Sequence, residues 1–412
     1  MGASISLDAV KNAYLNAGGI LVNEQLYQVL AESLNIDEAE FSRKASVGRD
    51  KSPHSLLKRQ VRWHQQTLKR LGLLERDPTE KGLWSLTEEA KGGLKLIKPG
   101  VSLLAYSTKL GLAIWGDNKT VLNEIDVPVT MCITSPPYPL RTQRNYGNVD
   151  ESAWVDFICT SLEPVLKLLV DGGSIVLNVS NDIFNKKSPS RSLYLEKMNI
   201  ALNERLGLEL MDRHVWENPS KPPAPTLWAC RNPIQLCTGY EPVLWFTNNP
   251  LSVTANNRNV LVPHTEQHKQ FLAKGGNQRE VQYGDGAYKL RKASFSNVTE
   301  GKIPKNVIKR GHACKDTRAL RQHAKALNLP AHSAMFPTSL VDFYIDYLTV
   351  QGDTVLDLFS GSNKVGLSAE RKGRQWIAIE RVLQYIRVQA EMFKEFDGFS
   401  MSSWMGVDYE QR

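Results

Sequence analysis

The N-terminal quarter of the chain follows a helical apolar pattern and then the pattern of a short hairpin. A helix of about 20 residues is expected to begin near Ser52-Pro53, because serine caps helices and proline fits the first helical turn. Its apolar side chains recur at helical spacing and form one stripe, made of Leu57, Val61, Leu68 and Leu71. Gly72–Glu75 ends the helix and enters a strand, a turn covers 77–82, and Leu83–Leu86 returns as a second strand.

Beyond residue 99 the pattern changes to short apolar runs that alternate with amphipathic stretches. Three of these runs are predicted to be buried strands, namely Thr130–Thr134, Ser174–Val179 and Glu241–Thr247. Trp154–Leu169 is predicted to be a helix that is closed by Asp171-Gly172-Gly173. Alternation of this kind predicts an α/β sheet that is covered by helices on both faces.

The alternation is interrupted between residues 250 and 330 and returns over 331–396. The interrupted stretch is also strongly basic: His264–Lys325 contains 14 Lys or Arg against five Asp or Glu, whereas the whole chain carries a net charge of +8. Such a charge balance favours a polyanionic partner, either nucleic acid or a membrane surface. The stretch is therefore either a flexible surface insertion or a module that reads DNA.

Length and composition set the remaining limits. A chain of 412 residues is too long for one ordinary domain, so we expect an N-terminal domain over 1–98 and an α/β domain over 99–412 that includes the basic region at about 250–330. We find no signal-peptide pattern and no apolar run of membrane-spanning length, and therefore expect a cytoplasmic protein without a membrane partner. The five cysteines form no Cys-x-x-Cys pair, which predicts neither a metal site nor a disulfide framework.

The sharpest local signal is Thr134-Ser135-Pro136-Pro137-Tyr138, directly after the first buried strand. These residue types suit chemistry on an exocyclic base amine, which is a poor nucleophile because its lone pair is delocalised into the ring. Ser135 can accept a hydrogen bond from such an amine, and the two prolines can hold the Pro136 carbonyl rigidly toward it. Tyr138 offers a flat face on which an extruded base can stack. The alternative is that two prolines after a strand form only a stiff turn.

A second motif, Val355–Asn363, is predicted to form a strand and a glycine turn that lead into a helix. The next strand ends at Glu380, 23 positions after Asp357. A glycine such as Gly361 lets the backbone approach a ligand closely, and an acid about 20 residues further on can bind both hydroxyls of a ribose. The turn lacks the Gly-x-Gly-x-x-Gly pattern of dinucleotide sites, which suits S-adenosylmethionine because that cofactor has a ribose and an adenine but no phosphate. The alternative is an ordinary tight turn between a strand and a helix.

Together these motifs resemble the β-class of amino-methylating DNA methyltransferases and, within that class, the PvuII-type N4-cytosine enzymes. The resemblance covers about Ile114–Phe396. It rests on the two motifs and on five further segments, namely Trp115–Asn118, Tyr146–Asn148, Ser190–Tyr194, Asn218–Lys221 and His332–Pro337. It implies a Rossmann-like α/β methyltransferase fold with a permuted motif order, in which the Pro-Pro-Tyr segment precedes the cofactor loop.

The resemblance also implies a function and a set of site residues. The protein would methylate the N4 amine of cytosine in double-stranded DNA, with S-adenosylmethionine as cofactor. The catalytic segment would be Ser135, Pro136, Pro137 and Tyr138, and the cofactor would be bound by Asp117, Phe336, Asp357, Phe359, Gly361, Asn363 and Glu380. In this set Asp357 would support the loop, Phe336 would lie near the methionine end of the cofactor, and Asp117 would lie near its adenine. The basic region 250–330 would hold the target-recognition elements.

Departures from the family pattern and alternative functions limit this interpretation. Lys364 stands where the family usually has threonine, and Ser333 where it has proline. A cytosine-C5 methyltransferase needs a cysteine nucleophile, typically after proline, and the chain has no Pro-Cys pair. Adenine-N6 methylation and a catalytically silent DNA-binding regulator stay open as alternatives. The resemblance further suggests a restriction–modification system, whose endonuclease would share the DNA site without forming a stable complex.

The N-terminal helix and hairpin resemble the winged-helix domain of Mrr-type restriction proteins. The resemblance spans Arg62–Glu89 and rests on an Arg-Trp pair, a Gly-Leu-Leu-Glu segment and a Gly-x-Trp-x-Leu-Thr segment. The helix carries basic side chains away from its apolar stripe, namely Lys58, Arg59, Arg62, Lys69 and Arg70. These would contact DNA phosphates. The alternative is a solvated basic helix in a docking domain.

Overall fold

The computed structural model describes residues 5–47, 52–70, 73–77, 80–87, 94, 96–140 and 149–406. The chain divides into two compact units, with the boundary between Lys95 and Leu96 and with Asn328–Pro330 grouped with the first unit. Among the described residues, no helix is both long enough and apolar enough to cross a membrane.

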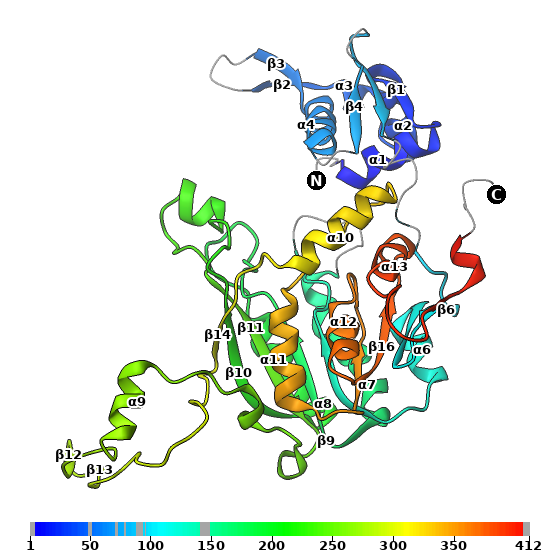
Figure 1. Ribbon diagram of the computed structural model, residues 1–412. Coiled ribbons are helices and arrows are strands. Elements are labelled where there is room, and N and C mark those ends of the chain that lie inside the picture. Colours follow the sequence, from blue (N-terminus) through cyan, green and yellow to red (C-terminus); the bar gives the residue numbers. More distant parts are fainter. Residues whose placement is uncertain are drawn as a thin grey trace. The chain divides into compact units, whose positions relative to one another are not determined.

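The first unit, blue in Figure 1, combines short helices with a small antiparallel sheet whose strand order is β1-β5-β4. Its helices are α1 (Leu7–Asn16), α2 (Asn23–Ser33), α3 (Glu38–Ser42) and α4 (Leu56–Arg70). Its strands are β1 (Ile20–Val22), β2 (Lys44–Val47), β3 (Ser52–Ser55), β4 (Leu74–Arg76) and β5 (Leu83–Leu86). The predicted stripe residues Leu57, Val61 and Leu68 are buried in its core, while Leu71 lies outside the described residues.

The start of helix α4 differs from the prediction. Ser52 and Pro53 belong to strand β3, which pairs with β2, and the helix begins only at Leu56 and covers 15 residues. Ser55 takes the capping position instead, because its Oγ accepts a hydrogen bond from the Lys58 N–H at 3.1 Å. Pairing with β2 therefore moves the N-cap by three residues, and local helix signals could not reveal that partner.

The second unit is built on a sheet that has ten strands among the described residues, in the order β14-β10-β11-β9-β8-β15-β16-β7-β6-β17. The strands are β6 (Ser102–Ser107), β7 (Gly111–Gly116), β8 (Val129–Thr134), β9 (Leu169–Asn178), β10 (Glu209–Glu217), β11 (Tyr240–Thr247), β14 (Val307–Lys309), β15 (Thr354–Asp357), β16 (Gln375–Glu380) and β17 (Ser400–Met401). A separate hairpin is formed by β12 (Val281–Tyr283) and β13 (Tyr288–Leu290).

The helices of this unit, including the short helical turns, lie between those strands along the chain. They are α6 (Asn118–Glu124), α7 (Glu151–Leu168), α8 (Tyr194–Leu206), η1 (Thr226–Arg231), η2 (Pro250–Ser252), η3 (Asn257–Val260), α9 (Glu266–Ala273), α10 (Lys315–Ala326), α11 (Thr338–Leu348), α12 (Lys364–Arg371), α13 (Leu383–Ala390) and η4 (Ser403–Gly406). This order of strands and helices agrees with the predicted alternation.

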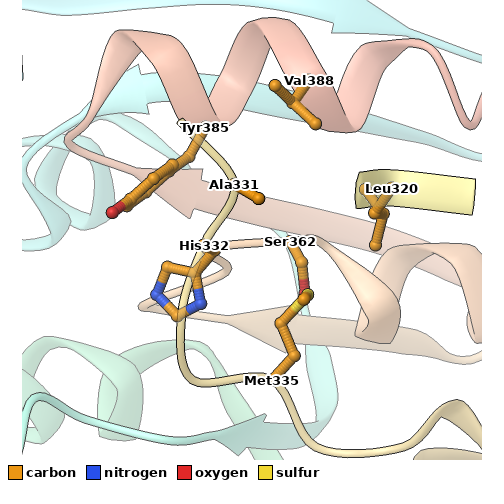
Figure 2. A pocket seen from close by; sticks show the side chains of 8 residues that line it. Leu320, Ala331, His332, Met335, Ser362, Tyr385 and Val388 are labelled. Atoms are coloured by element: carbon orange, nitrogen blue, oxygen red, sulfur yellow. The ribbon is translucent and has the colours of Figure 1, made fainter. Parts of the chain in front are cut away.

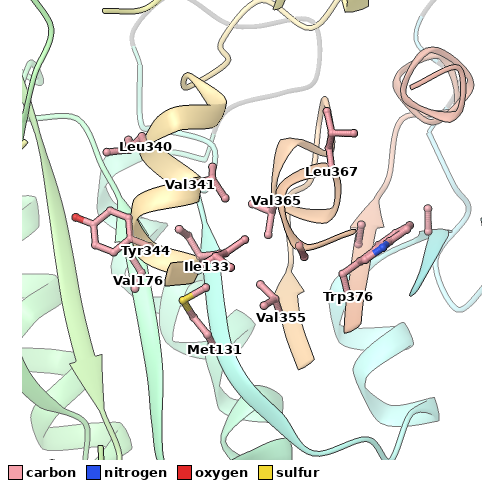
Figure 3. Packing of buried hydrophobic residues seen from close by; sticks show 14 of the residues in the cluster. Met131, Ile133, Val176, Leu340, Val341, Tyr344, Val355, Val365, Leu367 and Trp376 are labelled. Carbon is pink, nitrogen blue, oxygen red and sulfur yellow. The ribbon is translucent and has the colours of Figure 1, made fainter. Parts of the chain in front are cut away.

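Helices cover both faces of the sheet, as the alternation predicts. One apolar cluster joins buried residues of α11, α12 and α13 to the sheet, and a second joins those of α6, α7 and α8 to its other face. Figure 3 shows the first cluster, in which Val341 and Tyr344 of α11 lie over Met131 and Ile133 of β8. The unit is therefore a doubly wound α/β fold.

The five central strands β9, β8, β15, β16 and β7 run parallel to one another. The connection from β8 through α7 leads outward to β9, whereas the connection from β15 through α12 leads in the opposite direction to β16. The carboxyl ends of β8 and β15 therefore border a topological switch point, where doubly wound folds bind their ligands.

One predicted boundary within this unit is wrong, and one region is more regular than predicted. Strand β9 begins at Leu169 rather than Ser174, because Asp171-Gly172-Gly173 forms an irregularity within the strand rather than a closing turn. Gly172 has φ +72° there, and an added Cβ would lie 2.1 Å from the Ser252 carbonyl oxygen. The basic region 250–330 is more regular than its pattern indicated, since it contains α9 and α10 and contributes β14 to the edge of the sheet.

Packing in the sheet predicts a strict requirement for glycine at position 111. An added Cβ there would lie 2.3 Å from Cδ2 and 2.4 Å from the carbonyl oxygen of Trp376. We expect Gly111→Ala to lower the free energy of unfolding by roughly 1–3 kcal/mol, as overpacking of a dense core does. Thermal or denaturant unfolding measures this decrease. The matched control is Gly239→Ala, whose Cβ would meet no atom within 4 Å; equal decreases in both variants would contradict the prediction.

Candidate active site

Four loops at one edge of the sheet carry most of the predicted site residues. Asp117 follows β7, Ser135 follows β8, Phe359 follows β15, and Glu380 ends β16. These strands are parallel neighbours, so their carboxyl ends share one edge of the sheet. The predicted catalytic segment and the predicted cofactor loop thus lie on either side of the switch point.

A buried hydrogen bond joins the two central loops. Thr134, the last residue of β8, donates from Oγ1 to Asp357 Oδ1, the last residue of β15, at 2.7 Å. The Phe359 N–H donates to the same oxygen at 3.2 Å. Burial raises the pKa of the Asp357 carboxyl to about 7, against these two hydrogen bonds, which lower it. Asp357 therefore joins the end of β8 to the start of the loop after β15 from within.

The Pro-Pro-Tyr segment is held by a chain of hydrogen bonds. Ser135 Oγ lies 2.9 Å from the Tyr138 hydroxyl, and Asn178 Nδ2 donates to that hydroxyl at 2.8 Å. The same amide nitrogen donates to Glu241 Oε2 at 3.1 Å, and Glu241 Oε1 lies 3.3 Å from Lys221 Nζ. Burial, together with the negative charge of Glu241, raises the pKa of Tyr138 well above its usual range. The phenol therefore stays protonated at neutral pH.

Helix α7 fixes the same segment from behind. The buried Trp154 donates from Nε1 to the Pro137 carbonyl at 2.8 Å. Its ring packs edge-on against Tyr194 with 4.8 Å between ring centroids. The Tyr194 hydroxyl in turn donates to the Ser180 carbonyl. Tyr194, which lies in one of the family motifs, thus supports the Pro-Pro-Tyr segment indirectly, by packing against Trp154.

The loop after β15 turns through two residues in the left-handed region. Gly361 has φ +50°, and Asn363 has φ +48°. Asn363 is fully buried, caps α12, and donates from Nδ2 to the Tyr106 hydroxyl at 2.9 Å. It therefore shapes the loop from the interior. Phe359 is half-buried and packs against Phe157 at 5.7 Å between ring centroids.

Glu380 is a buried acceptor beside this loop. Its two carboxylate oxygens accept the Gly361 N–H at 2.7 Å and the Val382 N–H at 2.8 Å. Burial raises its pKa to about 7, although these hydrogen bonds lower it. A carboxylate offers about four acceptor sites, so Glu380 can accept a further hydrogen bond beyond those from the backbone. The neighbouring Ser360 hydroxyl is buried and has no hydrogen-bond partner among the described residues.

A small pocket opens beside Gly361. It is lined by Gly361, Ser362, His332, Tyr385, Leu320, Ala331, Met335 and Val388 (Figure 2). The His332 ring lies 3.1 Å from the position of a Cβ on Gly361 and packs edge-on against Tyr385. An added side chain at position 361 would therefore crowd the chain's own histidine, and the positive φ also favours glycine there.

Lys364 connects the predicted cofactor loop to the segment that carries Phe336. Its buried Nζ donates to the Phe336 carbonyl at 2.8 Å and to Thr317 Oγ1. It also lies 3.5 Å from Cys314 Sγ. Burial lowers the pKa of Lys364. This departure from the family pattern thus has a clear structural function, since it fixes the backbone at Phe336.

Asp117 lies close to the same edge. It caps α6 by accepting the Lys119 N–H at 3.1 Å, and it follows Trp115, which pairs with Glu380 in neighbouring strands. The site also includes residues to which sequence reasoning assigned no role: Thr134, Trp154, Asn178, Glu241 and His332. Thr134 and His332 did lie within quoted motifs, whereas Asn178 and Glu241 carried no local signal. The segment Tyr146–Asn148 lies outside the described residues.

Known proteins resemble this chain in sequence. The DNA methylase family matches residues 129–392. The type II methyltransferase M.PvuII of Proteus hauseri is 30% identical over 290 residues, which cover 70% of this chain and 85% of that protein. M.HpaI of Haemophilus parainfluenzae, also a type II methyltransferase, is 23% identical over 68% of this chain and 73% of its own length.

A solved structure agrees with these sequence matches. The PvuII DNA methyltransferase (cytosine-N4-specific) superposes with a TM-score of 0.55 and 27% identity, over 70% of this chain and 87% of that one. The family match covers well over half of the chain and spans the Pro-Pro-Tyr segment, the loop after β15 and Glu380. The chain therefore belongs to the DNA methylase family.

Proposed function

We propose that the protein transfers a methyl group from S-adenosylmethionine to the N4 amine of cytosine in double-stranded DNA. The observation that carries the proposal is the placement of Ser135 and Asp357 on the two sides of the switch point, joined through the Thr134–Asp357 hydrogen bond. This geometry supports a base amine and a methyl donor that meet above adjacent strand ends. The cytosine-N4 specificity of the PvuII enzyme supports the choice of target.

The residues around the loop after β15 fit S-adenosylmethionine. Glu380 can accept a further hydrogen bond, which a ribose hydroxyl would donate, and the buried Ser360 hydroxyl lacks a partner among the described residues. Phe359 offers a half-exposed ring, while Asn363 and Asp357 shape the loop beneath it. Phe336 would face the methionine end, and Asp117 the adenine. When bound, the cofactor supplies an electrophilic methyl group.

Ser135 and the Pro136 carbonyl would hold the two amine hydrogens of the target cytosine. Asn178 can present only its Nδ2 to the Glu241 carboxylate, so the same nitrogen donates to the Tyr138 oxygen. The Tyr138 proton can then point toward the Asn178 carbonyl at 3.4 Å. This arrangement lets Ser135 donate its own proton to Tyr138 and keep its lone pairs for the amine. The nitrogen lone pair is then free for the methyl group.

The target cytosine must leave the base stack to reach this segment, and Tyr138 offers the surface that would receive it. Double-stranded DNA also fits the charge of the chain, since His264–Lys325 contains 14 Lys or Arg against five Asp or Glu. We assign target recognition to the basic region at about 250–330.

A restriction–modification role follows from the type II names of the relatives, with an endonuclease that shares the site without stable association.

The N-terminal unit supports a winged-helix assignment, with domains at 1–98 and 99–412. The short helices and the antiparallel sheet with order β1-β5-β4 fit that fold, and α4 would be its recognition helix. Arg59, Arg62, Lys69 and Arg70 of α4 are exposed and available to phosphates.

The first prediction tests the product and Ser135 together. DNA methylated by the protein is digested to nucleosides and analysed by mass spectrometry, and we expect N4-methylcytosine. Methylation-aware sequencing of DNA from cells that express the protein then identifies the target site. Ser135→Ala should lower the rate on the order of 100-fold, as the removal of one transition-state hydrogen bond does, with cofactor affinity unchanged. N6-methyladenine as product would overturn the target, and full activity of Ser135→Ala would remove Ser135 from the mechanism.

The second prediction concerns Glu380. Glu380→Ala should weaken S-adenosylmethionine binding by at least about tenfold, because a charge-assisted hydrogen bond contributes roughly 1.5–3 kcal/mol. Calorimetry measures the affinity, with the exposed Glu395→Ala as control. Since the Glu380 pKa in the folded protein is about 7, wild-type affinity should rise as the pH increases through 7, and the Ala variant should not show that dependence.

The same raised pKa has a consequence for stability. An acid whose pKa is higher in the folded than in the unfolded state stabilises the fold below its unfolded value, here 4.5. That contribution is lost as the pH rises through about 7. As the pH rises from 4.5 to about 7, the unfolding free energy of the wild type should therefore fall relative to that of Glu380→Ala. If the wild type and Glu380→Ala showed the same pH dependence of cofactor binding and of stability, the role of Glu380 would be contradicted.

The third prediction separates the two units. A chain that starts at Leu96 keeps the pairing between Leu96 and Val382 and should retain cofactor binding and some methylation. Its DNA affinity should fall, and the salt dependence of binding should weaken by a slope of about 0.9 for each phosphate that is no longer neutralised. The full-length Arg59→Gln/Arg62→Gln variant should reproduce part of this change. Unchanged affinity and salt slope in the shortened chain would show that the first unit has another role.

A further inference from the structure

An exposed apolar loop lies next to the Pro-Pro-Tyr segment and is not explained by the chemistry above. The loop is Pro222–Gly239, between β10 and β11. Leu227, Ile234 and Leu236 are 45%, 63% and 88% exposed. Single exposed apolar side chains are common, but three within ten positions beside a candidate active site indicate a contact surface. We refer to this segment as the apolar loop.

Hydrogen bonds connect the base of the apolar loop to the predicted catalytic segment. Glu241, just beyond the loop, accepts from Asn178 Nδ2 at 3.1 Å, and the same nitrogen donates to the Tyr138 hydroxyl at 2.8 Å. Lys221, at the other end, pairs with Glu241 at 3.3 Å. Glu241 therefore lies two hydrogen bonds from Tyr138, the residue that would receive the flipped base, and Lys221 lies one contact further away.

The apolar loop is also ordered internally, which suits a surface that must keep its shape against a partner. The Thr238 N–H donates to the Ala224 carbonyl at 2.7 Å, and the Gln235 N–H donates to the Trp228 carbonyl at 2.8 Å. Gln235 Nε2 donates to the Pro189 carbonyl at 3.1 Å, which anchors the loop to a neighbouring segment. These hydrogen bonds fix the backbone that carries the exposed side chains of Ile234 and Leu236.

Charge favours DNA as the partner of this surface. Between residues 218 and 240 the chain contains Lys221 and Arg231 and no Asp or Glu. Lys221 is paired with Glu241, and Arg231 is exposed within the loop. An apolar surface with an exposed arginine matches a base stack bordered by phosphates, and apolar side chains that enter such stacks are a known means of opening them. A second copy of this chain, by contrast, would have to cover the exposed Arg231 with an acidic group.

We infer that the apolar loop inserts Leu236, supported by Ile234, into duplex DNA beside the target cytosine and fills the gap that the flipped base leaves. The inference rests on the proposed function, because only an enzyme that acts on a paired base needs such a wedge. Filling the gap offsets part of the cost of unstacking and holds the open DNA while the base lies on Tyr138. The loop therefore contributes to base extrusion rather than to methyl transfer itself.

The test compares paired and unpaired targets. Two short duplexes carry the site identified by sequencing, one with the target cytosine opposite guanine and one with it opposite an abasic position. Because flipping a paired base costs a few kcal/mol, Leu236→Ala should lower methylation of the paired duplex by about tenfold and leave the abasic duplex within about threefold of wild type. A 2-aminopurine placed next to the target should show a smaller fluorescence increase on binding. Ile234→Ala/Leu236→Ala should strengthen both effects.

The matched control is Leu251→Ala, which removes an equally exposed leucine at the opposite end of strand β11. Leu251 is 98% exposed and lies in η2, just after Thr247. It should not change either duplex. Equal loss of methylation on both duplexes, no loss on either, or a change in oligomeric state of Leu236→Ala measured by sedimentation would overturn the role of the loop. Wild-type methylation of the paired duplex tests the proposed function separately, so a methylating wild type with an unaffected Leu236→Ala rejects the loop alone.

Discussion

The hydrogen bond between Thr134 and Asp357 is the constraint on which the rest of the site depends. It joins the last residues of two parallel strands at the point where their connections diverge, and so fixes the distance between the loops that follow. On one side of it begins the Pro-Pro-Tyr segment, and on the other begins the loop that ends in Asn363. A methyl transfer requires its two reactants in line within a narrow distance range. This hydrogen bond keeps the Pro-Pro-Tyr segment and the loop after β15 at a fixed separation.

Burial around this bond gives the site its electrostatic character. Asp357 and Glu380 are both buried, and burial raises the pKa of each to about 7 against the backbone and side-chain hydrogen bonds that they accept. Because their pKa values are raised, these two buried acids reduce the stability of the fold as the pH rises. Buried acids that carry this cost are expected where their acceptor oxygens are needed. For Asp357 the need is internal to the loop, and for Glu380 we propose that it is the ribose of the cofactor.

Support and contact are divided between different residues. Trp154 and Tyr194 hold the Pro137 carbonyl from behind, while Asn363 and Lys364 hold the opposite loop and the Phe336 backbone. Phe359 and Tyr138, by contrast, are left half-exposed. The wedge inferred for the apolar loop extends this division outward, because its base is tied to Tyr138 through Asn178 and Glu241.

Much of this arrangement follows from sequence alone. The rest depends on contacts between residues that are far apart in the chain. Apolar periodicity predicts the alternation of strands and helices, and the Pro-Pro-Tyr segment and Gly361 identify the chemistry, because both depend on neighbours in the chain. The start of α4 and the course of β9 were mispredicted, since strand pairing with distant residues decided them. Asn178, Glu241 and His332 likewise acquire their roles only when separate strand ends and loops meet. Local pattern determined which elements form and which residues can react, whereas long-range contacts decided which side chains support them.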